Sequence, residues 1–168
     1  MRVRRLGDDR SQLQFVPAAL DDALTQPLFD ELAVEYADRY GSTPPTILAW
    51  LKKGPVSEFA PPDGGMLIGL LDGRAVTGGG FVRLDAETAE VKRVWTDSAH
   101  RRRGFAMALL AELEAQIAAS GYRKVYLVTG HRQPEAEELY RATGYTRLPA
   151  PLPTSGLVLP IAFEKRLA

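Results

Sequence analysis

The 168-residue chain contains no cysteine and only two histidines. The absence of cysteine excludes disulfide scaffolds, thiolate metal sites and cysteine nucleophiles. Two histidines do not favour a histidine-rich zinc site, so we expect no metal. The chain also lacks net charge, because 21 Lys and Arg balance 21 Asp and Glu. A balanced protein has no overall field that would draw it onto nucleic acid, although a local patch can still do so.

Long hydrophobic runs are missing as well. The longest, such as 66–71, are far too short to cross a bilayer. The basic residues near the N-terminus are not followed by the apolar stretch of a signal peptide. We therefore expect a cytoplasmic protein with no membrane partner. The length predicts one domain over 1–168 that buries a core without disulfides or metals, with loose residues at 1–12.

Hydrophobic periodicity predicts strands and helices in a mixed order. Strands are expected at 13–16, 66–71, 75–84, 89–96, 124–129 and 157–163. Helices are expected from a Thr25 cap to Gly41, near 47–51, over 104–120, and from Pro134 to Gly144. The glycines at 78–80 suggest a bulge or a close backbone approach, and Pro160 an edge strand or a bulge. This order predicts an α/β or α+β fold built on a mixed sheet.

Residues 94–107 form the most informative segment, because a predicted strand leads through a basic loop directly into a helix. The free N–H groups and the dipole at a helix start attract phosphate. Gly104 and Ala106 are small enough for close approach, and three arginines at 101–103 add charge. The segment matches neither the P-loop nor the dinucleotide fingerprint. A solvated turn or a nucleic-acid contact are the alternative interpretations of such an arginine run.

Three linked motifs resemble the GNAT superfamily of N-acetyltransferases. Arg101-x-x-Gly104-x-Ala106 is similar to its acyl-CoA signature, Arg/Gln-x-x-Gly-x-Gly/Ala. Residues 89–96 look like its fourth strand, and 129–145 look like its last helix and the turn that follows. The core motifs span about 66–148 in family order, as in small bacterial members whose substrate is unassigned. Arg102 and Ala106 replace commoner glycines, and Arg102 fits the pattern if its φ is negative.

The resemblance implies a GNAT fold that binds acetyl-CoA. Its sheet would be mixed, mostly antiparallel and of about six to seven strands, with a splayed parallel pair at the cofactor site. The backbone of the fourth strand would bind the pantetheine arm, and the N–H groups of the 102–107 loop the pyrophosphate. Gln133 either contacts the cofactor or caps the following helix. The implied cofactor-binding residues are Val94, Trp95, Thr96, Arg101, Arg102, Arg103, Gly104, Phe105, Ala106, Met107 and Gln133.

Two residues are the expected catalytic groups. Tyr140 resembles the family tyrosine that protonates the leaving thiolate, although a tyrosine here can also simply pack its ring in the core. Glu90 resembles the catalytic glutamate that several members carry on this strand. Regular alternation would put Glu90 on the face of Val94, where the N–H would stabilise the oxyanion. The alternatives for Glu90 are a solvated glutamate paired with Arg93 or Lys92, and an enzyme that uses a water relay.

The expected function is transfer of an acetyl group from acetyl-CoA to a primary amine on a small molecule or peptide. The amine would attack directly in a ternary complex, because no cysteine can carry the acyl group. Acceptor specificity would lie in segments 41–65 and 146–156. Carboxylates of the first helix, Glu31, Glu35 and Asp38, would suit a cationic amine or form a solvated face. Rival functions are an acyl-CoA sensor without turnover and a nucleic-acid module. The C-terminal strand is a possible site of homodimerisation.

Overall fold

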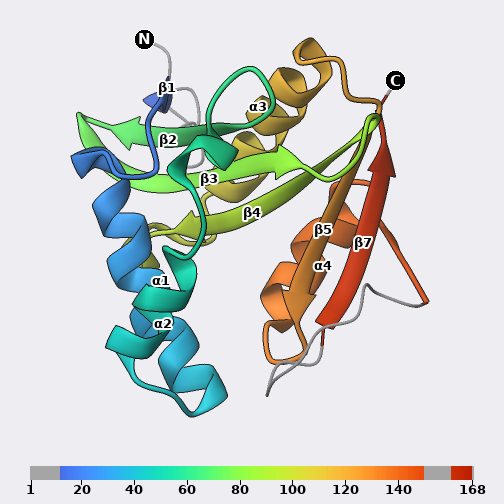
Figure 1. Cartoon of the computed structure of the whole chain (residues 1–168). Coiled ribbons are helices and arrows are strands. Elements are labelled where there is room, and N and C mark those ends of the chain that lie inside the picture. The colour runs from blue at the N-terminus through green and yellow to red at the C-terminus, as the bar shows by residue number, and fades with distance from the viewer. Residues whose placement is uncertain (1–11, 150–159, 168) are drawn as a thin grey trace, which may run out of the picture.

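The computed structural model describes residues 12–149 and 160–167. A seven-stranded sheet runs through them in the order β1-β2-β3-β4-β5-β7-β6 (Figure 1). Only β4 and β5 pair in parallel among the described strands, and every other neighbouring pair is antiparallel. The predicted mixed, mostly antiparallel sheet is confirmed. The strands are β1 (Gln14–Pro17), β2 (Gly65–Leu71), β3 (Arg74–Arg83), β4 (Thr88–Thr96), β5 (Lys124–Gly130), β6 (Thr146–Arg147) and β7 (Pro160–Arg166).

Helices cover both faces of this sheet. One core lies between the sheet and α1 (Gln26–Tyr40) with α2 (Pro44–Leu51), and contains Leu28, Phe29 and Leu51. The other lies under α3 (Phe105–Ala119) and α4 (Pro134–Ala142). Short 3-10 turns complete the fold at η2 (Ala23–Thr25), η3 (Val56–Phe59) and η4 (Ser98–His100). None of the helices in the described ranges has the length and apolarity that a membrane crossing requires.

The apolar stripe of α3 explains how that helix is held. Leu109, Leu110, Leu113 and Ile117 recur at helical spacing and are all fully buried. Burying each such side chain contributes roughly 1.5–3 kcal/mol relative to leaving it in water. The start of α1 differs from the prediction, because Thr25 makes no side-chain cap bond. Its hydroxyl is buried and donates to the carbonyl of Ala19 at 2.8 Å, so it ties the preceding turn instead.

A β-bulge between β3 and β4 changes the alternation predicted for β4. Gly78 pairs with Trp95 and Gly80 with Lys92, so two β4 residues, Arg93 and Val94, lie opposite one residue of β3. Arg93 takes a φ of 61° at this point. Because an extra residue shifts the alternation, Val94 joins the core under α3 while Trp95 joins the core under α1. Regular alternation along the strand would instead put Val91, Arg93 and Trp95 on one face, and this expectation from the sequence is wrong.

The glycines of β3 make this arrangement possible, as the sequence predicted. A Cβ on Gly80 would lie 2.7 Å from side-chain atoms of Met66 and Phe59. Such a distance is too short for any ordinary contact, so η3 and β2 approach the β3 backbone closely here. The same region holds the bulge that redirects Arg93.

β4 and β5 separate along their length. Thr88–Val91 pairs with Lys124–Leu127, and beyond these residues the two strands diverge, as Figure 1 shows. On the far side of β5, β7 lies between β5 and β6, so the prediction of an edge strand is wrong. Pro160 is the first residue of β7, a position where a missing N–H is tolerated. Residues 1–11 and 157–159, to which loose structure and the start of this strand were assigned, lie outside the described residues.

Candidate functional site

A cleft of about 690 Å³ opens where β4 and β5 separate. Its walls come from α1, the end of β4, the loop into α3, the end of β5 and α4. Most of the predicted site residues meet there, but Arg103 and Glu90 do not line it. The predicted residues that do line it are Val94, Trp95, Thr96, Arg101, Arg102, Gly104, Phe105, Ala106, Met107, Gln133 and Tyr140.

The β4 wall offers unpaired backbone groups. Past Val91, no residue of β4 pairs with β5 within the ranges that the structure describes. Backbone N–H and C=O groups need partners when they are shielded from water. An extended ligand with amide groups can supply these partners as an added strand. The side chain of Trp95 is buried in the α1 core, so this residue can meet such a ligand only through its backbone.

The start of α3 forms the anion-binding end of the cleft. Gly104 precedes the helix with a φ of 79°, and no side chain caps the first turn. The free N–H groups of this turn therefore point at the cleft with the positive end of the helix dipole. Ala106 lies in the same turn and lines the cleft. These groups fit a ligand that carries phosphate.

Arg102 contradicts the condition set from the sequence. Its φ is +64°, not negative, so it adopts the left-handed conformation in which glycine is the common residue. The short turn between η4 and α3 needs this backbone conformation whichever residue is present. For a residue with a Cβ, that conformation costs about 1–2 kcal/mol. The departure from the commoner glycine is accommodated at this energetic cost.

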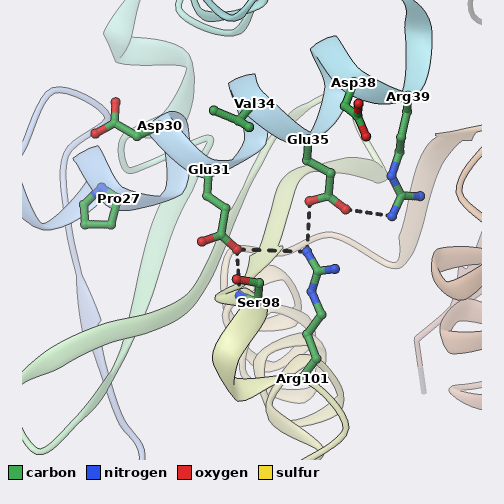
Figure 2. Close-up of a pocket in the computed structure, with 9 residues that line it drawn as sticks. All are labelled: Pro27, Asp30, Glu31, Val34, Glu35, Asp38, Arg39, Ser98 and Arg101. Carbon is green, nitrogen blue, oxygen red and sulfur yellow. Dashed lines mark hydrogen bonds and ion pairs between the residues drawn. The ribbon is translucent and has the colours of Figure 1, made fainter.

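Arg101 turns toward α1 in a second, shallow hollow beside the cleft (Figure 2). Its guanidinium lies 3.0 Å from a carboxylate oxygen of Glu35 and 4.0 Å from one of Glu31. Glu31 also accepts a hydrogen bond of 2.7 Å from the N–H of Ser98, and burial raises the pKa of Glu31. Glu31 and Glu35 are thus neither a free acceptor-binding pair nor a purely solvated face. They hold the β4–α3 loop against α1.

Gln133 fastens the opposite side of the cleft mouth. Its side-chain oxygen accepts from the N–H of Gly130 at 3.1 Å and from the hydroxyl of Tyr40 at 3.2 Å. Gln133 also occupies the N-cap position of α4, as the helix-cap alternative predicted, but its side chain makes no bond to the first turn of that helix. Arg39 of α1 reaches the same loop, where it donates to the carbonyl of Arg132 at 2.8 Å and pairs with Glu135.

Tyr140 both packs in the core and lines the cleft. Its side chain is only 6% exposed, and its ring lies 5.7 Å from that of Phe163 and 5.8 Å from that of Tyr145. Burial raises the pKa of Tyr140, with a smaller contribution from Tyr36. A raised pKa keeps the phenol protonated at neutral pH. The residue therefore keeps a proton that it can donate into the cleft.

Glu90 does not line the cleft. It is half-buried on β4 opposite Val82, which belongs to the α1 core, so it faces away from the side chain of Val94. The prediction that the two share a face is wrong because of the bulge. Burial raises the pKa of Glu90, while the charges of Lys92 and Arg93 oppose that rise.

Sequence reasoning missed two residues of the cleft wall. For Tyr36 the sequence favours core packing over a place in the wall of the acceptor site, yet this residue lines the cleft. Arg93 was considered only as a partner of Glu90, yet its guanidinium reaches α2. The glycine run at 78–80 was the one available signal for Arg93, since it indicated the bulge that redirects this side chain.

The family model of the Acetyltransferase (GNAT) family matches residues 25–145 of this chain. The chain belongs to this family. Among curated proteins, none matches the chain. The described residues contain no group of three acidic, histidine or cysteine side chains placed to hold a metal ion.

Solved structures support the same fold for this GNAT protein. One is assigned as an acyl-CoA N-acyltransferase from Klebsiella pneumoniae, with 27% identity and a TM-score of 0.74 over 94% of this chain and 99% of that one. Another is the GNAT domain of S. lividans PAT, with 19% identity and a TM-score of 0.68 over 92% and 90%. A third is a GNAT family acetyltransferase from Elizabethkingia anophelis with acetyl-CoA bound, with 15% identity and a TM-score of 0.64 over 94% and 99%.

Proposed function

We propose that this protein transfers an acetyl group from acetyl-CoA to a primary amine by direct attack in a ternary complex. The observation that carries this proposal is one cleft in which the unpaired end of β4 meets the uncapped start of α3. The first suits the amides of a pantetheine arm, and the second suits a pyrophosphate. The E. anophelis relative, which holds acetyl-CoA, adds support from the same fold.

The backbone supplies the binding groups in this proposal. The groups at Val94 and Thr96 bind the pantetheine amides and the acyl carbonyl, and the Val94 N–H stabilises the oxyanion. The N–H groups from Arg102 to Met107 hold the pyrophosphate, with the charge of the nearby arginines in support. Gln133 holds the β5–α4 loop at the cleft wall through Gly130 and Tyr40.

Two side chains move protons. Tyr140 donates a proton to the sulfur of the leaving thiolate, for which its buried phenol stays protonated. Glu90 accepts the proton of the attacking amine through a water molecule, because it does not line the cleft itself. The amine nitrogen thereby forms the new bond to the acyl carbon as the carbon–sulfur bond breaks.

Because Glu90 does not line the cleft, a second candidate function is also supported, that of an acyl-CoA sensor without turnover. Release of thiol from acetyl-CoA in the presence of primary amines separates the two functions. A sensor binds acetyl-CoA and releases no thiol above the uncatalysed rate.

Calorimetric titration with acetyl-CoA tests the binding site directly. We expect micromolar affinity for the native chain and at least about tenfold weaker binding for Ala106→Glu, since a carboxylate in the first turn repels the pyrophosphate. Glutamate is favourable for the helix at this position, so the variant should remain folded.

Ala115→Glu is the matched control, because it makes the same change at an exposed position of the same helix. It should bind acetyl-CoA as the native chain does. No binding by the folded native chain, or equal loss in both variants, would contradict the proposed site.

A further inference from the structure

We infer that Arg93 binds the carboxylate of the acceptor, so that the acceptor is an amine that also carries a carboxylate, such as a free amino acid. This inference rests on the proposed acetyl transfer and names the substrate class of that same site. It comes from the geometry of one strained residue in the cleft.

The backbone of Arg93 is held in an unusual conformation. It is a non-glycine residue in the middle of β4 with a φ of 61°, at the extra position of the bulge. A left-handed conformation at such a residue costs about 1–2 kcal/mol. Bulges beside active sites commonly re-aim one side chain. Here the side chain of Arg93 reaches the end of α2, and Arg93 also lines the cleft.

The guanidinium of Arg93 is held in place, but only some of its N–H donors make hydrogen bonds. Its Nε and Nη2 donate to the carbonyl of Leu51 at 3.2 and 3.1 Å, and its carbon lies 5.3 Å from the ring centre of Trp50. These contacts use two of the five N–H donors of an arginine. Within the described residues, Nη1 has no hydrogen-bond partner, and Arg93 lines the cleft.

The charge of Arg93 is also not neutralised locally. No carboxylate among the described residues lies within ion-pair distance of it, whereas Arg39 and Arg101 in the same cleft each have two. Glu90 and Glu58 act on it only from a longer range, and burial lowers the pKa of Arg93. A half-buried, unpaired guanidinium favours an anionic ligand that forms a planar two-point contact, which a carboxylate does.

Arg93 lies on the face from which the acceptor must approach. The start of α3, which suits the pyrophosphate, belongs with the α3 side of the sheet, whereas Arg93 contacts α2 on the other side. Tyr36 of α1 lines this part of the cleft, and Glu90 faces the same side. An amine directed toward Glu90 and a carboxylate held by Arg93 together describe a zwitterion.

If Arg93 had a purely structural role, it would not affect which acceptor the protein prefers. Leu51 is the last residue of α2, and a cation that binds its carbonyl stabilises the helix end. Such a role predicts lower stability for Arg93 variants and no change in the choice between acids and neutral analogues. The preference of the protein for a carboxylate is therefore the deciding quantity.

The test compares L-amino acids with their own amides, which keep the amine and the side chain but lose the carboxylate. Binding to the protein saturated with coenzyme A is measured by calorimetry, and acetyl transfer by thiol release. We expect the native chain to prefer at least one acid over its amide by about 10- to 100-fold in affinity and in kcat/KM. The amine of an amino acid amide is less basic than that of the acid, so more of it is deprotonated near neutral pH. Without a group that binds the carboxylate, the amide would therefore be the better substrate.

Three variants test whether Arg93 causes the preference for the acid over its amide. Arg93→Gln removes the charge while keeping a donor for Leu51, and should abolish the preference. Arg93→Lys keeps the charge and should retain part of it. Arg83→Gln removes a cation from the far end of β3, where it pairs with exposed Asp63, and should keep all of it.

Several results would overturn the inference. These are equal binding of acids and amides by the native chain, no binding of any acid, a preference that survives in Arg93→Gln, or one lost equally in Arg83→Gln. If Arg93→Gln does not fold, the native comparison and Arg93→Lys still decide. Failure of the proposed function is a separate result, since it appears as absent acetyl-CoA binding by the folded native chain in the calorimetric titration.

Discussion

At the scale of single residues, Glu90 makes the proposed chemistry sensitive to pH. Burial raises the pKa of Glu90 above the ordinary value of 4.5, and a proton acceptor works only when deprotonated. We expect kcat/KM to fall on the acid side with an apparent pKa above 4.5. Glu90→Gln should lower kcat by about 100-fold or more and remove this part of the profile. Steady-state kinetics across pH measure both effects.

The stability of Glu90→Gln shows whether a loss of activity in this variant comes from lost chemistry or from unfolding. Because the folded state raises the pKa of Glu90, the stability present below pH 4.5 is lost as pH rises through the raised value. The neutral Gln keeps that contribution, so Glu90→Gln should be at least as stable as the native chain at pH 7. Glu87→Gln, an exposed neighbour, is the control and should change neither profile nor stability. If kcat/KM of Glu90→Gln falls at acid pH as it does for the native chain, protonation of the substrate amine alone causes that fall, and Glu90 is not the proton acceptor.

At the scale of elements, α1 ties the two sides of the cleft mouth together. Glu31 and Glu35 hold the β4–α3 loop, while Arg39 and Tyr40 hold the β5–α4 loop. We expect Arg39→Met to speed amide hydrogen exchange over 130–137 by about tenfold, since it removes a charge-assisted bond worth about 1–2 kcal/mol. The variant should also lower kcat, because α4 carries Tyr140.

Arg141→Met is the control for this element. Arg141 pairs with Glu137 at 3.2 Å within α4 and makes no hydrogen bond or ion pair to α1 among the described residues. Its loss should change exchange over 130–137 by less than a factor of about two, because an exposed pair contributes little. Equal exchange in Arg39→Met and the native chain would show that α1 does not hold this loop.

At the scale of the whole molecule, local patterns predicted more than long-range ones. The stripe of α3, the loop at 101–106 and the order of strands follow from nearby residues, so the fold and the loop that leads into α3 were predictable. The conformation of Arg93 depends on the register of two strands, and Gln133 binds Tyr40, which is 93 residues away. The glycine run at 78–80 indicated a bulge but not the contact that Arg93 makes, and no spacing in the sequence indicates the contact between Gln133 and Tyr40. The part of the cleft that is proposed to bind the acceptor was therefore the part that sequence reasoning described least.

The separation of β4 from β5 raises the question of whether the chain unfolds as one unit. Among the described residues, only the pairs from Thr88–Val91 to Lys124–Leu127 join the two halves of the sheet. One core nevertheless crosses this line, since Phe81 of β3, Leu113 of α3 and Phe163 of β7 belong to the same buried cluster. We propose that 1–168 is a single domain and expect one calorimetric transition, with equal calorimetric and van't Hoff enthalpies.

Acetyl-CoA should then shift that single transition as a whole. The ligand is proposed to bind between the two halves, so it stabilises the folded state by about 2.7 kcal/mol at 100 times its dissociation constant. For a domain of this size, that energy raises the midpoint by roughly 5–10 °C. Two transitions, of which acetyl-CoA moves only one, would contradict the single domain. They would show that β5, β7 and α4 unfold apart from the β1–β4 half, despite the core that the two halves share.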